Sequence, residues 1–231
     1  MKQVLTPDKH YLYVQRAARF FTLGAWCDDI CEVWVVLHGY GQTADRFVES
    51  FRPILRKDRF FVAPEGLSRF YHGSHDPDRV GASWMTSVER SLDISDYTAY
   101  IDAVMERIMA WPIAQPIRLV GLGFSQGTAT LTRWAMRSAY PINDMVLYGG
   151  DWAYEASPDK LFRHFKRAYH YLLAGDADRY MPEERIEKMA QTYADAGLEH
   201  ELIRYAGGHA VLAKPLQILS ELMDYYHHGA L

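Results

Sequence analysis

Hydrophobic residues in this chain form short continuous runs that alternate with longer stretches of helical periodicity. An apolar run of roughly four to eight residues between turn residues is typical of a strand buried on both faces of a sheet. Such runs predict strands at 32–37, 59–64, 117–122, 145–148, 168–174 and 201–205.

Between the runs, apolar residues recur at helical spacing. The clearest predicted helix covers 93–111 and is stopped by Pro112, and others are predicted at 128–138, 182–197 and 214–227, with a short one at 47–51. Strands that alternate with helices favour a doubly wound, mostly parallel sheet with helices on both faces. We therefore expect a single α/β domain over residues 1–231.

The N-terminal region has a different pattern. Two segments rich in β-branched and aromatic residues, Tyr11–Val14 and Arg19–Leu23, are separated by a few polar and small residues. This pattern predicts an antiparallel hairpin at the edge of the sheet.

Residues 65–91 show neither helical nor strand periodicity, so the sequence predicts a long irregular loop. Loops of this length in a compact domain are often functional, and this one could act as a lid. It carries Phe70, Tyr71, Trp84 and Met85, which we expect to line an apolar substrate pocket. The alternative is that these side chains only fix the loop to the core.

Composition narrows the class of protein. The 231 residues are 49% hydrophobic with a net charge of −4, and no cluster of Lys and Arg suggests nucleic acid as a partner. No apolar run has the length of a signal peptide or a membrane span, so we expect a cytoplasmic protein without stable membrane insertion. Neither Cys27 and Cys31 nor the histidines and aspartates of 72–78 have the spacing of a metal site, so no metal and no cofactor are expected.

One stretch carries a specific chemical signal. Gly123-Phe124-Ser125-Gln126-Gly127 follows a predicted strand and precedes a predicted helix. This is the setting of a nucleophile elbow, in which a sharp turn exposes a serine in a strained backbone conformation. We therefore expect Ser125 to be a catalytic nucleophile.

A serine nucleophile needs a base and an acid that orients the base. In hydrolases with this turn, the partners follow in the order serine, acid, histidine. His209 lies in a glycine-bearing loop after the last strand and is the expected base. Asp178, in the loop after the preceding strand, is the expected acid. Asp176 and Asp151 are the alternatives.

The negative charge that develops on a substrate carbonyl needs backbone N–H donors. One expected donor is the amide of Gln126, which the elbow places at the start of a helix. The other is expected from His38-Gly39-Tyr40-Gly41 after the first central strand, with the amide of Tyr40 preferred and His38 supporting the loop.

Four segments together resemble the phospholipase/carboxylesterase family of α/β-hydrolases, which includes acyl-protein thioesterases and small bacterial carboxylesterases. They are Leu37–Gly41, Gly123–Gly127, Gly175–Asp178 and Gly207–His209. The resemblance implies the α/β-hydrolase fold, a triad of Ser125, Asp178 and His209, and an oxyanion hole formed by the amides of Tyr40 and Gln126. The chain departs from the family pattern at Arg179-Tyr180-Met181 and around Ser83-Trp84-Met85.

We therefore expect a serine carboxylesterase that hydrolyses short- to medium-chain acyl esters through an acyl-enzyme. A lysophospholipase or acyl-protein thioesterase acting on lipidated substrates is the alternative within the same chemistry. A binding protein without catalysis on a hydrolase scaffold is a more remote one. The expected partner is a small-molecule acyl ester. The sequence does not decide the oligomeric state, and a homodimer is one option.

Overall fold

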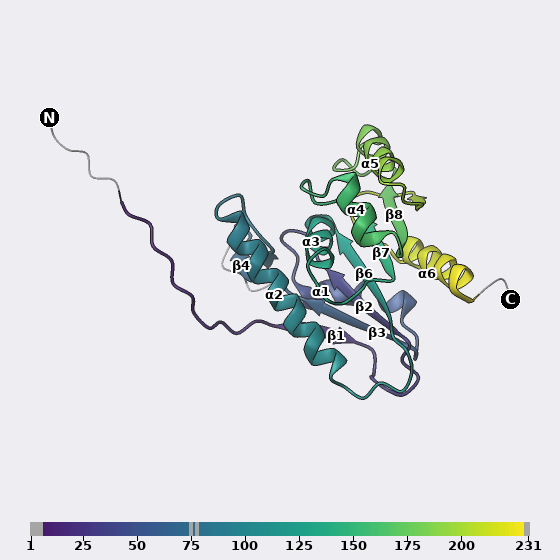
Figure 1. Ribbon diagram of the computed structural model, residues 1–231, viewed down its shortest axis with the longest axis horizontal. Helices are drawn as coiled ribbons and strands as arrows, with labels where there is room; N and C mark the ends of the chain where they lie inside the picture. The colour runs from purple at the N-terminus through teal and green to yellow at the C-terminus, as the bar shows by residue number, and fades with distance from the viewer. Residues whose placement is uncertain (1–6, 74–75, 77–78, 229–231) are drawn as a thin grey trace.

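The computed structural model describes residues 7–73, 76 and 79–228. At its centre lies a seven-stranded sheet in the order β1-β3-β2-β6-β7-β8-β9 (Figure 1). β1 runs antiparallel to β3, and every other neighbouring pair is parallel. The strands are β1 (Phe20–Leu23), β2 (Glu32–Leu37), β3 (Arg59–Pro64), β6 (Arg118–Phe124), β7 (Asp144–Tyr148), β8 (Tyr169–Gly175) and β9 (Glu201–Tyr205).

Helices cover both faces of this sheet. One face is covered by α2 (Arg90–Met109), α3 (Gln126–Ala135), α4 (Pro158–Phe165) and α5 (Glu183–Asp195). The other is covered by α1 (Ala44–Glu49), a 3-10 turn at Arg52–Ile54, and α6 (Ala213–His228). This is the predicted doubly wound α/β-hydrolase architecture, although the sequence reasoning did not foresee α4.

Two apolar layers hold these helices to the sheet. In β2, Val33, Val35 and Leu37 face one layer while Trp34 and Val36 face the other. All six residues of β2 are buried, because successive strand side chains point to opposite faces and both faces are covered. The continuous apolar runs in the sequence follow directly from this burial.

Charged residues at the amino ends of the parallel strands pair with one another. The buried Arg59 guanidinium donates from Nε to Glu32 Oε2 at 2.6 Å, and Arg118 Nε donates to Asp144 Oδ2 at 2.6 Å. These two pairs place buried charges beside opposite charges at this end of the sheet, and the opposite end carries the predicted site.

The predicted N-terminal hairpin is wrong. Residues 20–23 form β1, but β1 pairs with β3 and not with residues 11–14. Residues 7–19 are exposed and lead away from the body of the protein as an extended chain (Figure 1). Tyr11–Val14 have side chains that favour strands, but this preference depends on packing against a neighbouring strand, and no strand of the described residues pairs with them.

The predicted irregular loop at 65–91 is also partly wrong. It contains a small antiparallel sheet of β4 (Ser68–Tyr71) and β5 (Val80–Ser83), and α2 begins at Arg90, before the predicted start at Asp93. β4 is four residues long and mostly exposed, so it has no buried face to create an alternating pattern. His75 and Asp78, in the segment considered above as a metal site, lie outside the described residues.

Candidate active site

Ser125 lies at the sharp turn between β6 and α3. Its φ of 53° is in the left-handed region, which is strained for a residue with a side chain. A Cβ on Gly123 would come within 2.3 Å of the Gly127 carbonyl oxygen, and one on Gly127 within 2.1 Å of the Leu37 carbonyl oxygen. Only glycine fits at these two positions, so both glycines of the motif are required by the turn.

His209 reaches the serine from the loop after β9. Its Nε2 lies 2.9 Å from Ser125 Oγ. The ring lies between Phe124, with centroids 4.8 Å apart, and Tyr180, at 4.6 Å. Both contacts are tilted, and the His209 side chain is 19% exposed, so the imidazole packs against aromatic rings and is still accessible to solvent.

Asp178 holds the other side of the imidazole. Its buried Oδ2 lies 2.7 Å from His209 Nδ1, and its Oδ1 accepts a hydrogen bond from the Tyr180 amide at 2.8 Å. A carboxylate can only accept hydrogen bonds, so Nδ1 carries the proton and Nε2 of the neutral ring is free to accept one from Ser125. Asp178, His209 and Ser125 therefore form one hydrogen-bonded series.

The two alternative acids have other contacts. Asp176 Oδ1 accepts a hydrogen bond from the Gly207 amide at 2.9 Å and so ties the loop after β8 to the loop that carries His209. Asp151 Oδ1 accepts one from the Trp152 amide at 2.7 Å, and its Oδ2 lies 3.7 Å from Arg185 Nε.

The two expected amide donors come from loops at the same edge of the sheet. Gln126 is the first residue of α3, where backbone N–H groups have no partner within the helix and the helix dipole is positive. Tyr40 lies in the loop after β2, which passes so close to the elbow that a Cβ on Gly39 would lie 3.2 Å from Ser125 Cβ. Within the described residues, no hydrogen bond uses the amide of Tyr40 or of Gln126.

The side chain of Gln126 has a structural contact that the sequence reasoning missed. Its Oε1 accepts a hydrogen bond from the Trp84 amide at 3.2 Å, and its Nε2 donates to the Met85 carbonyl at 3.1 Å. These bonds attach the start of α3 to the segment after β5. The signal in the sequence is the polar glutamine beside the candidate nucleophile, for which the motif predicts a role of the backbone amide alone.

The sequence matches the profile of one protein family, described as Phospholipase/Carboxylesterase, over residues 29–227. The chain belongs to the phospholipase/carboxylesterase family. A comparison with curated protein sequences gave no match.

Several solved structures of esterases and thioesterases have the same fold. The crystal structure of esterase PE8 is similar with a TM-score of 0.66 and 21% identity, covering 89% of this chain and 97% of its own. Acyl-protein thioesterase 2 of Zea mays has a TM-score of 0.67 and 16% identity, covering 90% and 98%. The carboxylesterase of Bacillus cereus has a TM-score of 0.64 and 12% identity, covering 90% and 93%.

A cleft of about 230 Å³ opens beside Ser125 in this phospholipase/carboxylesterase family member. Trp152, Tyr180, Asp151 and Arg185 contribute to its walls. Sequence reasoning did not select Tyr180 or Arg185, although Tyr180 lies in the segment where the chain departs from the family pattern. The cleft therefore combines aromatic surface with a charged pair.

The four predicted pocket residues do not lie together in this cleft. Trp84 is 2% exposed and stacks on His38 with centroids 4.9 Å apart, so the expectation that it lines the pocket is wrong. Its Nε1 donates to the His38 carbonyl at 2.8 Å. The side chain fixes the segment after β5 to the core, which was the alternative stated above.

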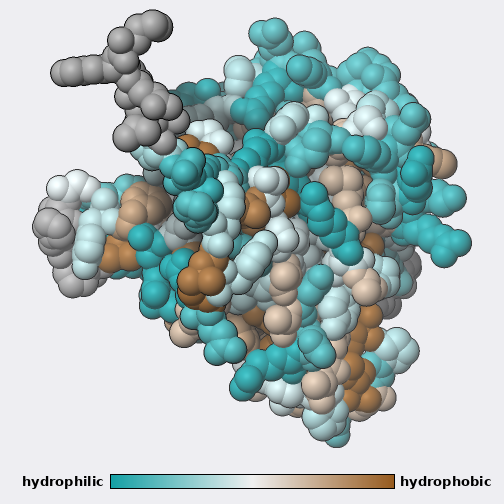
Figure 2. All heavy atoms as spheres, turned by 60° about the vertical axis from the view of Figure 1, so that its left-hand side comes forward, coloured by the Kyte–Doolittle hydropathy of each residue, from teal (hydrophilic) through white to brown (hydrophobic). Residues whose placement is uncertain are grey.

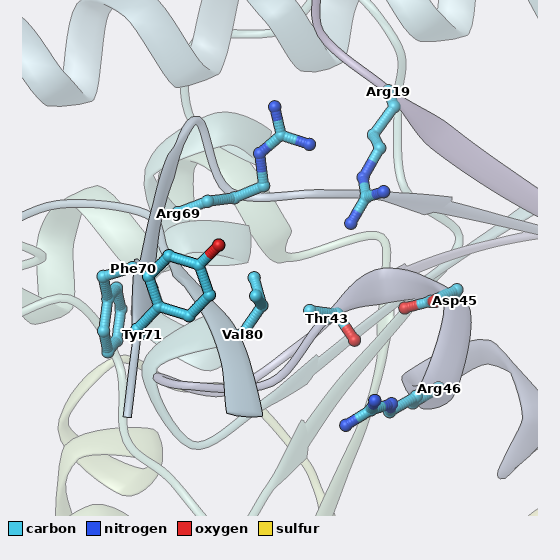
Figure 3. Close-up of a pocket in the computed structure, with 8 residues that line it drawn as sticks. All are labelled: Arg19, Thr43, Asp45, Arg46, Arg69, Phe70, Tyr71 and Val80. Carbon is cyan, nitrogen blue, oxygen red and sulfur yellow. The ribbon is translucent and has the colours of Figure 1, made fainter. Parts of the chain in front are cut away.

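Phe70, Tyr71 and Met85 have different surroundings. Phe70 stacks on Tyr40 with centroids 5.1 Å apart, beside the candidate amide donor. Phe70 and Tyr71 also line a second hollow of about 430 Å³, where Arg19, Arg46 and Arg69 contribute cationic groups (Figure 3). Met85 is connected to the site through its carbonyl oxygen, which accepts a hydrogen bond from the Gln126 side chain.

His38 supports the loop after β2, as expected. The buried ring accepts a hydrogen bond from the Gly66 amide at Nε2, 2.9 Å away, and its Nδ1 lies 2.8 Å from the Gly39 carbonyl oxygen. Burial lowers the pKa of His38 to about 4, so the imidazole is neutral at physiological pH. Both ring nitrogens are occupied by the backbone.

No helix in the described part of the chain is long and apolar enough to cross a membrane. Among residues 7–73, 76 and 79–228, no group of three or more His, Cys, Asp or Glu side chains is placed to hold a metal ion.

Proposed function

We propose that this family member is a serine carboxylesterase in which Ser125 is the nucleophile, His209 the general base and acid, and Asp178 the residue that orients His209. The observation that carries the proposal is the hydrogen-bonded series of these three side chains, with 2.7 Å from Asp178 to His209 and 2.9 Å from His209 to Ser125. Its order and tautomer are those that a serine nucleophile needs.

In the proposed reaction, Ser125 Oγ attacks the acyl carbon while its proton passes to His209 Nε2. The amides of Tyr40 and Gln126 donate hydrogen bonds to the oxyanion, each contributing about 3 kcal/mol to stabilisation of the transition state. The imidazolium then protonates the leaving alcohol. Water, deprotonated by His209, attacks the acyl-enzyme and releases the acid.

The cleft favours short- to medium-chain acyl groups. Its volume of about 230 Å³ is below the roughly 300–1,000 Å³ that is usual for sites enclosing larger ligands. Asp151 and Arg185 add charge to its wall, which disfavours a long alkyl chain because burying charged groups against hydrocarbon is costly. We infer that lipidated substrates are poorer than small esters.

The test is a labelling experiment with a fluorophosphonate, followed by mass mapping of the modified residue. We expect modification at Ser125, and we expect Ser125→Ala to lose nearly all hydrolysis of nitrophenyl esters with little change in melting temperature. Ser91→Ala, at an exposed position in α2, is the matched control and should keep full activity. Turnover that persists in Ser125→Ala would overturn the assignment.

Chain-length preference tests the substrate class separately. We expect kcat/KM for nitrophenyl esters and the matching thioesters to peak at short or medium chains and to fall for long ones. Rates that rise steadily up to palmitoyl substrates would instead favour the lysophospholipase or thioesterase alternative, without affecting the roles of the three residues.

A further inference from the structure

Residues 7–19, here called the N-terminal arm, carry four large apolar side chains that contact little of the protein. Tyr11, Leu12, Tyr13 and Val14 are 59%, 86%, 85% and 75% exposed. On the face shown in Figure 2, hydrophobic residues otherwise form small separate patches among hydrophilic ones. Four consecutive exposed apolar residues of strand-forming type are unfavourable in water and typical of a segment that binds a partner.

The strand that follows the arm has an unpaired edge. β1 is the first strand in the order of the main sheet, and within the described residues it pairs with β3 alone. The N–H and C=O groups on its outer side are therefore available to another strand, and such edges readily accept one.

The arm does not cover this edge in its own chain. The connection between Val14 and Arg19 is Gln15-Arg16-Ala17-Ala18, which lacks the Gly, Asn, Asp or Pro that tight hairpin turns favour. In the structure this connection contains no turn, and residues 16–19 line a groove with residues 65–67. Arg19 is anchored there by two hydrogen bonds to Glu65, at 2.7 and 3.0 Å.

Contacts of the far end of the arm with its own chain are weak. Lys9 forms an ion pair with Glu89 at the start of α2, and both side chains are substantially exposed. Exposed ion pairs stabilise little, because water screens them. This ion pair holds Lys9 near α2 but leaves the side chains of residues 11–14 exposed.

We propose that two copies of this chain form a symmetric dimer by exchanging their N-terminal arms, with residues 10–14 of each copy pairing antiparallel along the free edge of β1 in the other. The two segments have the sequence pattern of a hairpin. The exchange makes between two copies the strand pairing that does not form within one copy. Exchange of an identical element is a low-cost route to a closed, two-fold dimer.

The first test compares oligomeric state across a concentration series, by sedimentation or light scattering on the full chain. We expect the wild type to form a dimer. We expect the double variant Leu12→Asp, Val14→Asp to raise the dissociation constant (Kd) of this dimer by at least about 30-fold. Ile113→Asp, at another exposed apolar position, is the matched control and should leave Kd unchanged. A wild-type monomer at all concentrations, or a dimer unaffected by the double variant, overturns the proposal.

A second variant distinguishes exchange from simple contact between arms. Arg16→Asn combined with Ala17→Gly supplies the Asn-Gly turn that lets residues 11–14 pair with β1 of the same chain. We expect a monomer in which hydrogen exchange at residues 10–14 is as slow as in the wild-type dimer, while these amides exchange fast in the double aspartate variant. If the Asn-Gly variant remains fully dimeric, arm exchange is wrong. Unchanged melting temperatures serve as the control for folding.

Discussion

The loop after β2 and the loop after β9 each carry a histidine beside glycine at the same edge of the sheet, yet the two imidazoles have different surroundings. The contacts of both rings require the proton on Nδ1, which donates to the Gly39 carbonyl in His38 and to the Asp178 carboxylate in His209. The difference lies at Nε2. In His38 it accepts a backbone amide, and in His209 it faces a hydroxyl.

This difference decides which ring can take up a proton. Protonating His38 would place an N–H against the Gly66 amide inside the core, and burial already lowers its pKa to about 4. Protonating His209 costs no hydrogen bond with the backbone, and Asp178 stabilises the resulting charge. A histidine at a strand end is therefore a candidate base only when its second nitrogen faces a group that can give up a proton.

Exchanging each histidine for glutamine gives the largest expected contrast. We expect His209→Gln to lower kcat/KM for a short nitrophenyl ester by a factor on the order of 10⁶, because the amide cannot accept the Ser125 proton as a base. The melting temperature should change little, and His38→Gln is the matched comparison. Comparable activity losses in the two variants would contradict the distinction between the rings.

A smaller loss is expected for Asp178→Asn. The amide can donate to Nδ1 and so favours the wrong tautomer of His209, which should lower kcat by about 10⁴. KM should stay nearly constant, since Asp178 is buried behind His209 and does not line the cleft. Asp176→Asn is the control in the same loop, and an equal loss of kcat there would reassign the acid.

The pH dependence of kcat/KM should show the same mechanism. A protonated His209 cannot accept the Ser125 proton, so kcat/KM should fall in acid, approaching about tenfold per pH unit. Initial rates over pH 4 to 9, in buffers of constant ionic strength, measure this limb. An activity that stays flat down to pH 4 would be incompatible with His209 as the base.

The smallest effect on activity is expected for His38→Gln, within about tenfold of wild type, because glutamine can still accept the Gly66 amide. Stability should respond instead. The pKa of His38 is about 4 in the folded protein against 6.5 for the free side chain, so the unfolded chain binds more protons between these values and stability falls as pH drops.

This loss amounts to about 3 kcal/mol between pH 6.5 and pH 4. Urea unfolding across that range should therefore show a steeper decline in the free energy of unfolding for wild type than for His38→Gln. Parallel slopes would show that His38 does not carry the effect.

Much of the fold was predictable because burial leaves a direct pattern. β2 and β3 are buried at every position, so both are continuous apolar runs in the sequence. β4 is mostly exposed and α4 buries only Leu161 and Phe165, so neither has a strong pattern. The hairpin prediction was wrong for a different reason. The strand preference of residues 11–14 is a local property, and it does not determine whether these residues pair with β1.

The sequence motifs were enough to select the candidate residues of the site that lie within them. Ser125 and His209 lie in glycine-flanked loops at strand ends, whereas choosing Asp178 over Asp176 depended on which carboxylate meets the ring, which is a three-dimensional question. Trp84 was misplaced because an aromatic residue in a long loop has the same pattern whether it lines a cleft or enters the core. Tyr180 was missed because its place in the site comes from a tilted ring contact with His209, which only the folded chain shows.

The tight contacts at the elbow have a consequence for how this enzyme can change. Any side chain at 127 would collide with the carbonyl of Leu37, 2.1 Å away, so this position beside Ser125 tolerates almost no sequence variation. Tyr180 and Arg185, on the other wall, are largely exposed and meet no such limit. Substitutions at Tyr180 and Arg185 can therefore change which ligands the cleft accepts, and saturation mutagenesis at these two positions can exploit this, while the turn at Ser125 keeps its sequence.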